Sequence, residues 1–148
     1  MKFAGLDLDF AVLPAPVPIR YGEVSAQAWV SAAKAVAEEG GRLLALWAGV
    51  ATELIAEDSY TTSTSSINVA YITPVGVFWL STPVVLKQSR WVYPDLAAWF
   101  PAANRMQRAA ADLSGVYPDG AADARPWLNH GAWAADHFPL QQPATALP

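Results

Sequence analysis

Cysteine is absent from this chain of 148 residues, so the chain can hold no disulfide and no zinc ion or iron-sulfur cluster bound through thiolates. Basic residues are also few. Nine lysines and arginines stand against thirteen acidic residues, which gives a net charge of -4. Because no basic cluster with interleaved aromatic residues offers a surface for a phosphate backbone, nucleic acid is not an expected partner.

Targeting signals are missing from the sequence as well. Asp7 and Asp9 interrupt the amino-terminal stretch, which lacks the basic segment, apolar core and cleavage site of a secretory signal. Residues 67–86 carry no charge, but Pro74 and Pro83 break this span, which favours a buried hairpin over a membrane helix. We therefore expect a cytoplasmic protein.

Apolar and aromatic residues are abundant. Hydrophobic residues make up 53% of the chain, only 15% is charged, and there are seven tryptophans. A chain of this length suits one domain with one core, here residues 1–148. For any single tryptophan the core is the commoner position, whereas seven together suggest a docking surface.

The amino-terminal half predicts helix and strand in turn. Residues 1–22, with the proline-rich stretch 14–18, form an extended lead-in. Residues 25–39 form a helix, because apolar residues recur at helical spacing before a glycine pair. Residues 42–48 read as a short central strand. The hydroxyl-rich residues 57–66 fit a solvated loop or an edge ribbon, and the loop is the preferred prediction.

The second half predicts a hairpin and then helices. Residues 67–73 and 77–82 are strands joined by a tight turn, and residues 84–94 fit either a strand or a loop. Helices are expected at 95–100 and 102–114, with Gly115 ending the latter, and a β-turn at 117–120. The rest is coil with a frayed tail at 141–148. The fold class is α+β: a two-layer domain with a mixed or antiparallel sheet packed by helices, and an irregular carboxy-terminal extension.

The stretch 101–140 is specific in residue order. A helix reads Gln107-Arg108-Ala109 and is followed by Asp112 and Gly115; the next loop holds Asp123 and Arg125, and His137 comes just before Pro139-Leu140. This order resembles the carboxy-terminal signature of a family of small subunits of respiratory-chain NADH dehydrogenase, which is complex I. The segments ANRMQRAAADL, GAADARPWL and HGAW resemble most the variant at the amino terminus of formate hydrogenlyase and hydrogenase-4 type large subunits.

The resemblance implies a structural and assembly role without catalysis. Such a protein lies in the cytoplasmic arm of a membrane-bound hydrogenase or complex I-like oxidoreductase and touches the membrane only through its complex. It docks on a nickel-iron-hydrogenase-like large subunit beside iron-sulfur subunits. Nickel-iron centres and iron-sulfur clusters are expected only in those partners, and no cofactor in this chain. The motif residues expected at an interface or in a structural role are Asn104, Arg105, Arg108, Asp112, Gly115, Asp123, Arg125, Trp127, Trp133 and His137.

Two roles stay open for the charged motif residues. Arg108 and Asp112 lie one helical turn apart, and a guanidinium there can bind a partner carboxylate or anchor a loop of its own chain. Asp123 and Arg125 lie in an irregular segment, so they are expected to tie down its backbone. Trp127 and Trp133 could be interface anchors or plugs for the carboxy-terminal coil.

Two other classes of function compete with assembly. His130, Asp136 and His137, with Asp119 or Asp123, could form a nitrogen and oxygen metal site or an acid-base pair, although their spacing matches no standard motif. Alternatively, aromatic residues of the sheet could line a small-ligand pocket, for which the plain alternative is a hydrophobic core. These aromatic residues are Trp47, Tyr71, Phe78 and Trp79.

Overall fold

The structure, a computed structural model, describes residues 2–3, 6–56 and 59–141. The elements of its amino-terminal half are β1 (Lys2–Phe3), β2 (Leu6–Asp7), β3 (Ala11–Leu13), β4 (Ile19–Glu23), α1 (Ala26–Glu38) and β5 (Arg42–Ala56). Those that follow are β6 (Ser59–Thr73), β7 (Gly76–Pro83), β8 (Val85–Lys87), β9 (Arg90–Pro94), α2 (Ala103–Ser114), β10 (Val116–Asp119) and the short 3-10 helix η1 (Pro139–Gln141).

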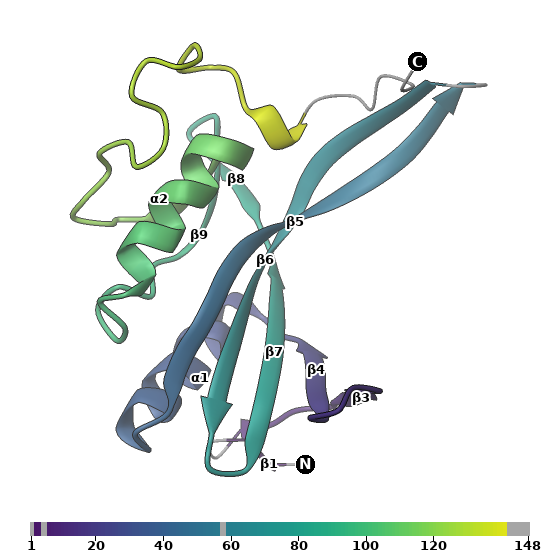
Figure 1. The fold of residues 1–148 in the computed structure, drawn as a ribbon, viewed down its shortest axis with the longest axis vertical. Coiled ribbons are helices and arrows are strands. Elements are labelled where there is room, and N and C mark those ends of the chain that lie inside the picture. Colours follow the sequence, from purple (N-terminus) through teal and green to yellow (C-terminus); the bar gives the residue numbers. More distant parts are fainter. Residues whose placement is uncertain (1, 4–5, 57–58, 142–148) are drawn as a thin grey trace.

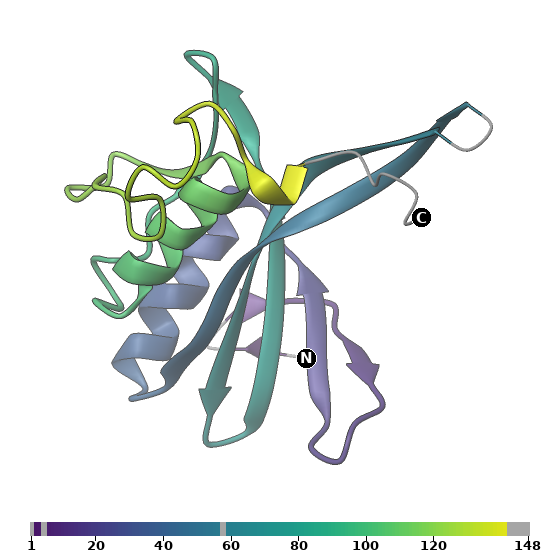
Figure 2. The same cartoon turned by 45° about the horizontal axis from the view of Figure 1, so that its top comes forward.

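The main sheet has the strand order β3-β4-β7-β6-β5 and is mixed, because β4 and β7 run parallel and the other neighbours antiparallel. A smaller sheet has the order β10-β9-β8, and β1 pairs with β2. Both helices lie on one side of the main sheet, and its other face is bare of helices (Figures 1 and 2). The predicted α+β class with a mixed sheet is confirmed.

Helix α1 follows the sequence prediction closely. The Ser25 hydroxyl caps its start by accepting a hydrogen bond from the backbone N–H of Ala28, at 3.1 Å. Gly40, just beyond the cap, has a φ of 75°, which an L-residue adopts only with strain. The residues that the helix buries against the sheet are those of the predicted apolar face: Trp29, Ala32, Ala33 and Val36.

The predicted hairpin is also present. Strands β6 and β7 pair antiparallel with Thr73 opposite Gly76, so Pro74 and Val75 form the two-residue connection. The Thr73 hydroxyl accepts a hydrogen bond from the Val75 backbone N–H at 3.3 Å, which fixes the turn. Alternate residues of the two strands face the helices and are fully buried: Ile67, Val69, Tyr71, Phe78 and Leu80.

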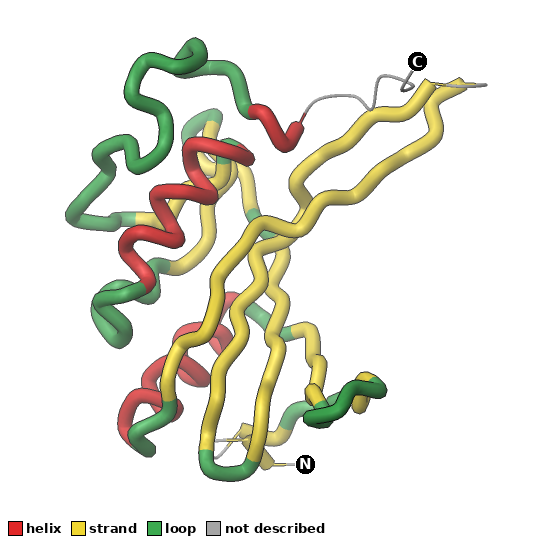
Figure 3. The backbone as a smooth tube through the Cα atoms, in the orientation of Figure 1, coloured by secondary structure: helices red, strands yellow, loops and turns green. Residues whose placement is uncertain are grey.

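The strand predicted at 42–48 is present, but it is longer than predicted and lies at the edge of the main sheet, not in its centre. The loop predicted at 57–66 is wrong where the structure describes it, because residues 59–66 are strand. Strand β5 continues to Ala56, and β6 begins at Ser59 and pairs with it along its length, while residues 57–58 lie outside the described part. The reason is that β-branched threonines suit an extended ribbon even when the composition is polar. Register shifts at Leu43/Ala45, Gly49/Val50 and Leu54/Ala56 add twist. The outer part of this ribbon, residues 50–56 and 59–64, projects beyond the rest of the fold (Figures 1 and 3), and we call it the arm.

Three local predictions need correction. Residues 95–100 contain a turn at 97–99 and not the predicted helix. The Asp95 carboxylate accepts from the Ala97 N–H and the Gln107 amide, but Pro101 has no N–H with which the turn could continue as a helix. Residues 117–120 are mostly strand β10, since they pair in parallel with β9, and not a β-turn. The lead-in 1–22 holds strands β1 to β3 and most of β4, although residues 14–18 are exposed coil as predicted.

The structure also decides the open assignment of residues 84–94 and tests the start of the predicted frayed tail. Residues 84–94, which fitted strand or loop, contain strands β8 and β9. The predicted frayed tail is wrong at Gln141, which ends η1 and donates from its amide to the Ser114 carbonyl and the Thr64 hydroxyl. Residues 142–148 of that predicted tail lie outside the described residues.

Candidate functional site

The first candidate site is the surface where α2 holds the irregular carboxy-terminal segment, residues 120–138. Asn104, Arg108 and Asp112 follow one another at intervals of four along α2, so their side chains share one face of the helix. The segment that passes over this face has almost no regular structure. Its backbone must therefore find hydrogen-bond partners outside itself.

Arg108 supplies several of these partners. Its Nε donates to the carbonyl of Arg125 at 2.6 Å and its Nη2 to the carbonyl of Pro126 at 3.0 Å. Its Nη1 donates to Asn104 Oδ1 at 3.2 Å and lies 3.4 Å from Asp123 Oδ2. The side chain is only 12% exposed. The sequence left two roles open for Arg108, a contact with a partner carboxylate or an anchor for a loop of its own chain. The contacts in the structure are those of the anchor.

Asp112 binds the next residues of the same segment. Its Oδ2 accepts hydrogen bonds from three consecutive backbone N–H groups, those of Trp127, Leu128 and Asn129, at 2.8, 2.6 and 3.0 Å. Burial disfavours the charged carboxylate, but these three donors and the nearby Arg108 outweigh it, so the pKa of Asp112 lies below its ordinary value. The spacing of Arg108 and Asp112 thus serves one purpose, because both hold the backbone between residues 125 and 129.

Asp123 and Arg125 form a local clamp, as predicted for this loop. Arg125 Nε and Nη2 donate to the two carboxylate oxygens of Asp123 at 2.9 and 2.8 Å, and its backbone N–H donates to Oδ1 at 3.2 Å. These hydrogen bonds lower the pKa of Asp123 and raise that of Arg125. The Arg125 side chain is 78% exposed, so the clamp lies at the surface.

Trp127 lies across the arginines of α2. The guanidinium carbons of Arg105 and Arg108 are 5.2 and 5.1 Å from its ring centroid, within the range of cation-π attraction. The ring is still 37% exposed, and its neighbour Leu128 is 42% exposed. Trp127 is therefore a plug over the arginines whose ring remains partly exposed, and its role as an interface anchor stays a prediction.

Asn129 was missed by the sequence analysis. Its Oδ1 accepts from the backbone N–H groups of Gly131 and Trp133, each at 3.2 Å, and its Nδ2 donates to the Trp133 carbonyl at 2.9 Å. The signal was available, because an asparagine two residues before a glycine is typical of an Asx-type turn. The half-buried Trp133 is placed by this turn.

Gly115 and the histidines complete the set of motif residues. Gly115 has a φ of 66° at the end of α2, and a Cβ there would lie 2.9 Å from the Phe138 ring. His130 Nε2 lies 3.0 Å from the Trp127 carbonyl, and His137 and Asp136 are exposed. Among the described residues no three His, Asp or Glu side chains are placed to hold a metal ion. The structure therefore does not bring together the metal set considered from the sequence.

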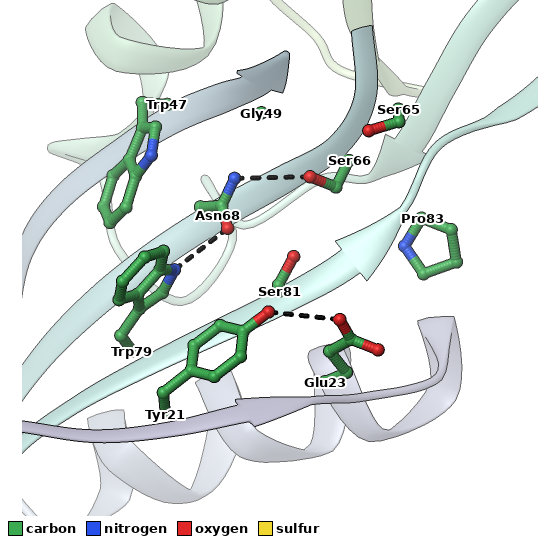
Figure 4. Close-up of a pocket in the computed structure, with 10 residues that line it drawn as sticks. All are labelled: Tyr21, Glu23, Trp47, Gly49, Ser65, Ser66, Asn68, Trp79, Ser81 and Pro83. Atoms are coloured by element: carbon green, nitrogen blue, oxygen red, sulfur yellow. Dashed lines mark hydrogen bonds between the residues drawn. The ribbon is translucent and has the colours of Figure 1, made fainter. Parts of the chain in front are cut away.

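A second candidate site lies on the bare face of the main sheet. It is an open concavity of about 470 Å³, which we call the aromatic pocket (Figure 4), lined by Tyr21, Glu23, Trp47, Gly49, Ser65, Ser66, Asn68, Trp79, Ser81 and Pro83. The sequence suggested four aromatic residues for a ligand pocket, but successive side chains of a strand point to opposite faces of the sheet, so the four lie on two different faces. Trp47 and Trp79 line this pocket, whereas Tyr71 and Phe78 are fully buried in the core and do not.

A hydrogen-bonded frame holds the aromatic rings in the pocket. Trp79 Nε1 donates to Asn68 Oδ1 at 2.9 Å, and Tyr21 packs edge-on against Trp79 with ring centroids 4.6 Å apart. The ring centroid of Trp47 lies 5.6 Å from that of Trp79, on the side of Trp79 away from Tyr21. Gly49 lies in the floor, where a Cβ would meet the Ser66 hydroxyl and force that side chain to move. Apart from Trp47 and Trp79, these pocket residues were not expected from the sequence.

The described residues contain no helix that is long and apolar enough to cross a membrane. Most of the uncharged span at 67–86 lies in the β6–β7 hairpin, as predicted, and its last residues lead into β8.

This chain belongs to the family of the 30 kDa subunit of respiratory-chain NADH dehydrogenase, whose model matches residues 23–146. The resemblance to the small subunits of respiratory-chain NADH dehydrogenase is therefore confirmed. A search of curated proteins gave no match.

The fold is similar to a chain in a solved structure described as the membrane-bound sulfane sulfur reductase (MBS), an archaeal respiratory membrane complex. The TM-score is 0.50 at 16% sequence identity, and the alignment covers 75% of this chain and 62% of that one. At this identity the likeness shows the fold alone.

Proposed function

We propose that this protein is a non-catalytic structural subunit of a membrane-bound, complex I-like oxidoreductase, and that it docks on a nickel-iron-hydrogenase-like large subunit. Family membership makes it a subunit of the respiratory-complex type. The hydrogenase branch is favoured by the segments ANRMQRAAADL, GAADARPWL and HGAW. In this proposal the chain lies on the cytoplasmic side, and the nickel-iron or iron-sulfur centres belong to its partners.

The arm is the observation that carries the proposal. It extends well beyond the body of the fold (Figures 1 and 2). A two-stranded ribbon standing alone in water is marginally stable at best. At its base the Thr64 hydroxyl donates to the Ser114 carbonyl at 3.3 Å and ties the ribbon to the end of α2. A ribbon that extends away from its own core is suited to contact another subunit.

Exposed apolar side chains support the same role. Large ones gather at the β8–β9 hairpin, along the carboxy-terminal segment and in η1, where they add surface that a partner can cover. They are Val85, Leu86, Trp91, Trp127, Leu128 and Leu140. The arm and the carboxy-terminal segment lie on different parts of the fold (Figure 1), so the proposed docking surface is extended and not a single small patch.

The test is affinity capture of the tagged full chain from its native membranes in mild detergent, with co-purifying subunits identified by mass spectrometry. We expect a hydrogenase-like large subunit together with iron-sulfur subunits. Recovery of the chain alone would overturn the docking proposal. Recovery with unrelated soluble proteins would have the same consequence.

A further inference from the structure

The aromatic pocket belongs neither to the core nor to the contacts by which α2 holds residues 120–138, which we call the carboxy-terminal anchor. Its composition therefore needs another explanation. A sheet face that meets water normally carries scattered polar residues. This face instead brings three aromatic rings from three strands together around hydroxyl groups: Tyr21 from β4, Trp79 from β7 and Trp47 from β5 (Figure 4). Trp79 lies between the other two rings and packs against both Tyr21 and Trp47.

The charge of the pocket is one-sided. Of its ten lining residues, Glu23 is the one with a formal charge at neutral pH. Its side chain is exposed and accepts a hydrogen bond from the Tyr21 hydroxyl at 3.2 Å. Burial and the charge of Glu23 raise the pKa of Tyr21, so this phenol remains a neutral donor that fixes the carboxylate. Within the described part of the chain, no cationic side chain lines the pocket to balance Glu23.

The hydrogen-bonding groups that remain fit a cation better than an anion. Asn68 is occupied by the frame, since its Oδ1 accepts from Trp79 and its Nδ2 lies 3.5 Å from Ser66 Oγ. The other polar groups are the Glu23 carboxylate and the hydroxyls of Ser65, Ser66 and Ser81. Carboxylate and hydroxyl oxygens accept hydrogen bonds from a cation, and aromatic faces attract a cation through their quadrupole.

We propose that the aromatic pocket receives an arginine side chain from a partner subunit, with its guanidinium over the indoles of Trp47 and Trp79 and its N–H groups donating to Glu23 and the pocket serines. Arginine is favoured over lysine because its planar group stacks on aromatic rings and donates in several directions at once. Arginine is also enriched where few residues dominate an interface. This inference rests on the proposed function, because it supposes that the chain docks on another subunit.

The first test titrates the purified full chain with Nα-acetyl-arginine amide and follows the indole N–H signals of Trp79 and Trp47 by NMR. The control is Nα-acetyl-citrulline amide, which has nearly the same shape without the charge. We expect saturable shifts with the arginine probe and much smaller ones with citrulline. Glu23→Gln should weaken binding about tenfold, a loss typical of one charge-assisted hydrogen bond.

Three outcomes of this titration would overturn the inference. Equal binding of the citrulline probe would show that the pocket does not recognise the positive charge of arginine. Equal binding of the arginine probe by the Glu23→Gln variant would show that the carboxylate is not used. Saturable binding of methyl glucoside, with no arginine binding, would assign the aromatic rings and hydroxyls to a carbohydrate.

A second test separates this inference from the docking proposal. Glu23→Arg and Glu39→Arg make the same charge change, but the exposed Glu39 caps α1 and does not line the pocket. We expect Glu23→Arg to reduce co-purification of the large subunit at least several-fold and Glu39→Arg to leave it unchanged. Equal recovery with both variants would reject the arginine inference and leave docking intact. If the wild-type chain recovers no partner, the docking proposal falls, and the titration alone decides what the pocket binds.

Discussion

At the residue scale, the carboxy-terminal segment depends on a few polar side chains. Arg108 and Asp112 together satisfy five backbone groups between residues 125 and 129. No regular element there supplies these hydrogen bonds. A hydrogen bond to a charged group contributes about 1.5–3 kcal/mol, less where water can replace it, so the loss of either side chain should weaken the hold on the whole segment.

Asp112→Ala is expected to lower the free energy of unfolding by about 1–3 kcal/mol, because three backbone N–H groups lose their acceptor. Urea unfolding followed by tryptophan fluorescence measures the change. Asp136→Ala is the matched control at an exposed position of the same segment, with an expected change within about 0.5 kcal/mol. Equal effects of the two substitutions would show that the hydrogen bonds of Asp112 contribute nothing.

The same carboxylate makes stability depend on pH. Its pKa is lower in the folded protein than its ordinary value of 3.8, so Asp112 stabilises the fold above pH of about 4. This contribution is lost as the pH falls through the lower, folded-state pKa. Asp112→Asn should therefore flatten the acid side of the curve of unfolding free energy against pH. An unchanged curve would contradict the assigned shift.

Arg108 and Arg125 are expected to respond differently to charge reversal. Arg108→Glu removes a nearly buried anchor and should lower the free energy of unfolding by about 2–3 kcal/mol. Arg125→Glu changes an exposed side chain, so the isolated chain should remain folded while capture of the large subunit weakens. Thermal unfolding and affinity capture of both variants check this. If Arg125→Glu unfolds the chain, Arg125 is an internal anchor and not an interface residue.

At the element scale, the end of α2 is where the helix and the carboxy-terminal segment meet. Gly115 turns the chain with a φ of 66° directly beneath the Phe138 ring. Gly120 has a similar φ of 72°, but nothing lies within 4 Å of a Cβ built there. The two glycines therefore separate the cost of backbone conformation from the cost of a side-chain clash.

Gly120→Ala should lower the free energy of unfolding by about 1 kcal/mol through backbone strain alone. Gly115→Ala should cost more, because the ring of Phe138 must also move. Urea unfolding of both variants, and of Gly115→Ala combined with Phe138→Ala, separates the two contributions. Equal losses at both glycines, with no relief in the double variant, would show that the Phe138 contact is unimportant.

The arm makes a prediction of a different kind. Residues 52–62 can be replaced by an Asn-Gly turn that joins Ala51 to Ser63, which face each other across the ribbon. Thr64 is buried and bonded to the Ser114 carbonyl, and the pairing of β6 with β7 from Ser66 onward is kept, so the shortened chain should fold with a melting temperature close to that of the wild type. Capture of the large subunit should be lost. Full capture by the shortened chain would show that the arm is not a docking element.

The sequence predicted the structure correctly where a local residue pattern and the need to bury an apolar face favour the same element. The apolar spacing in α1, the Pro74-Val75 turn and the cap at Gly115 were each predictable, because local chemistry and burial favour the same structure. The length of β5 and β6 was not, since a polar, hydroxyl-rich ribbon carries no apolar alternation to reveal it.

The candidate sites were predictable to different degrees. The resemblance identified the residues of the carboxy-terminal anchor, but spacing alone could not show that Arg108 binds backbone carbonyls of its own chain. The aromatic pocket combines Tyr21, Trp47 and Trp79 from three strands, and their meeting depends on the strand order of the sheet. A single sequence carries no signal for that order.

At the scale of the whole molecule, the helices cover one face of the sheet and the arm projects away from it (Figures 1 and 2). The aromatic pocket and the exposed apolar side chains also lie outside the core. Family membership and this division together support a chain that works by being held in a larger assembly. The carboxy-terminal anchor then has a clear use, because it presents Trp127 and Leu128 in a fixed place.

The most direct measurement is the subunit ratio in the assembly that contains this chain. The tagged full chain is captured from native membranes, the eluate is fractionated by size, and each co-eluting protein is quantified by mass spectrometry. We predict one large particle in which this chain, a hydrogenase-like large subunit and iron-sulfur subunits are present in equal amounts. Elution of the chain as a free monomer, with no large subunit in any fraction, would contradict the central claim.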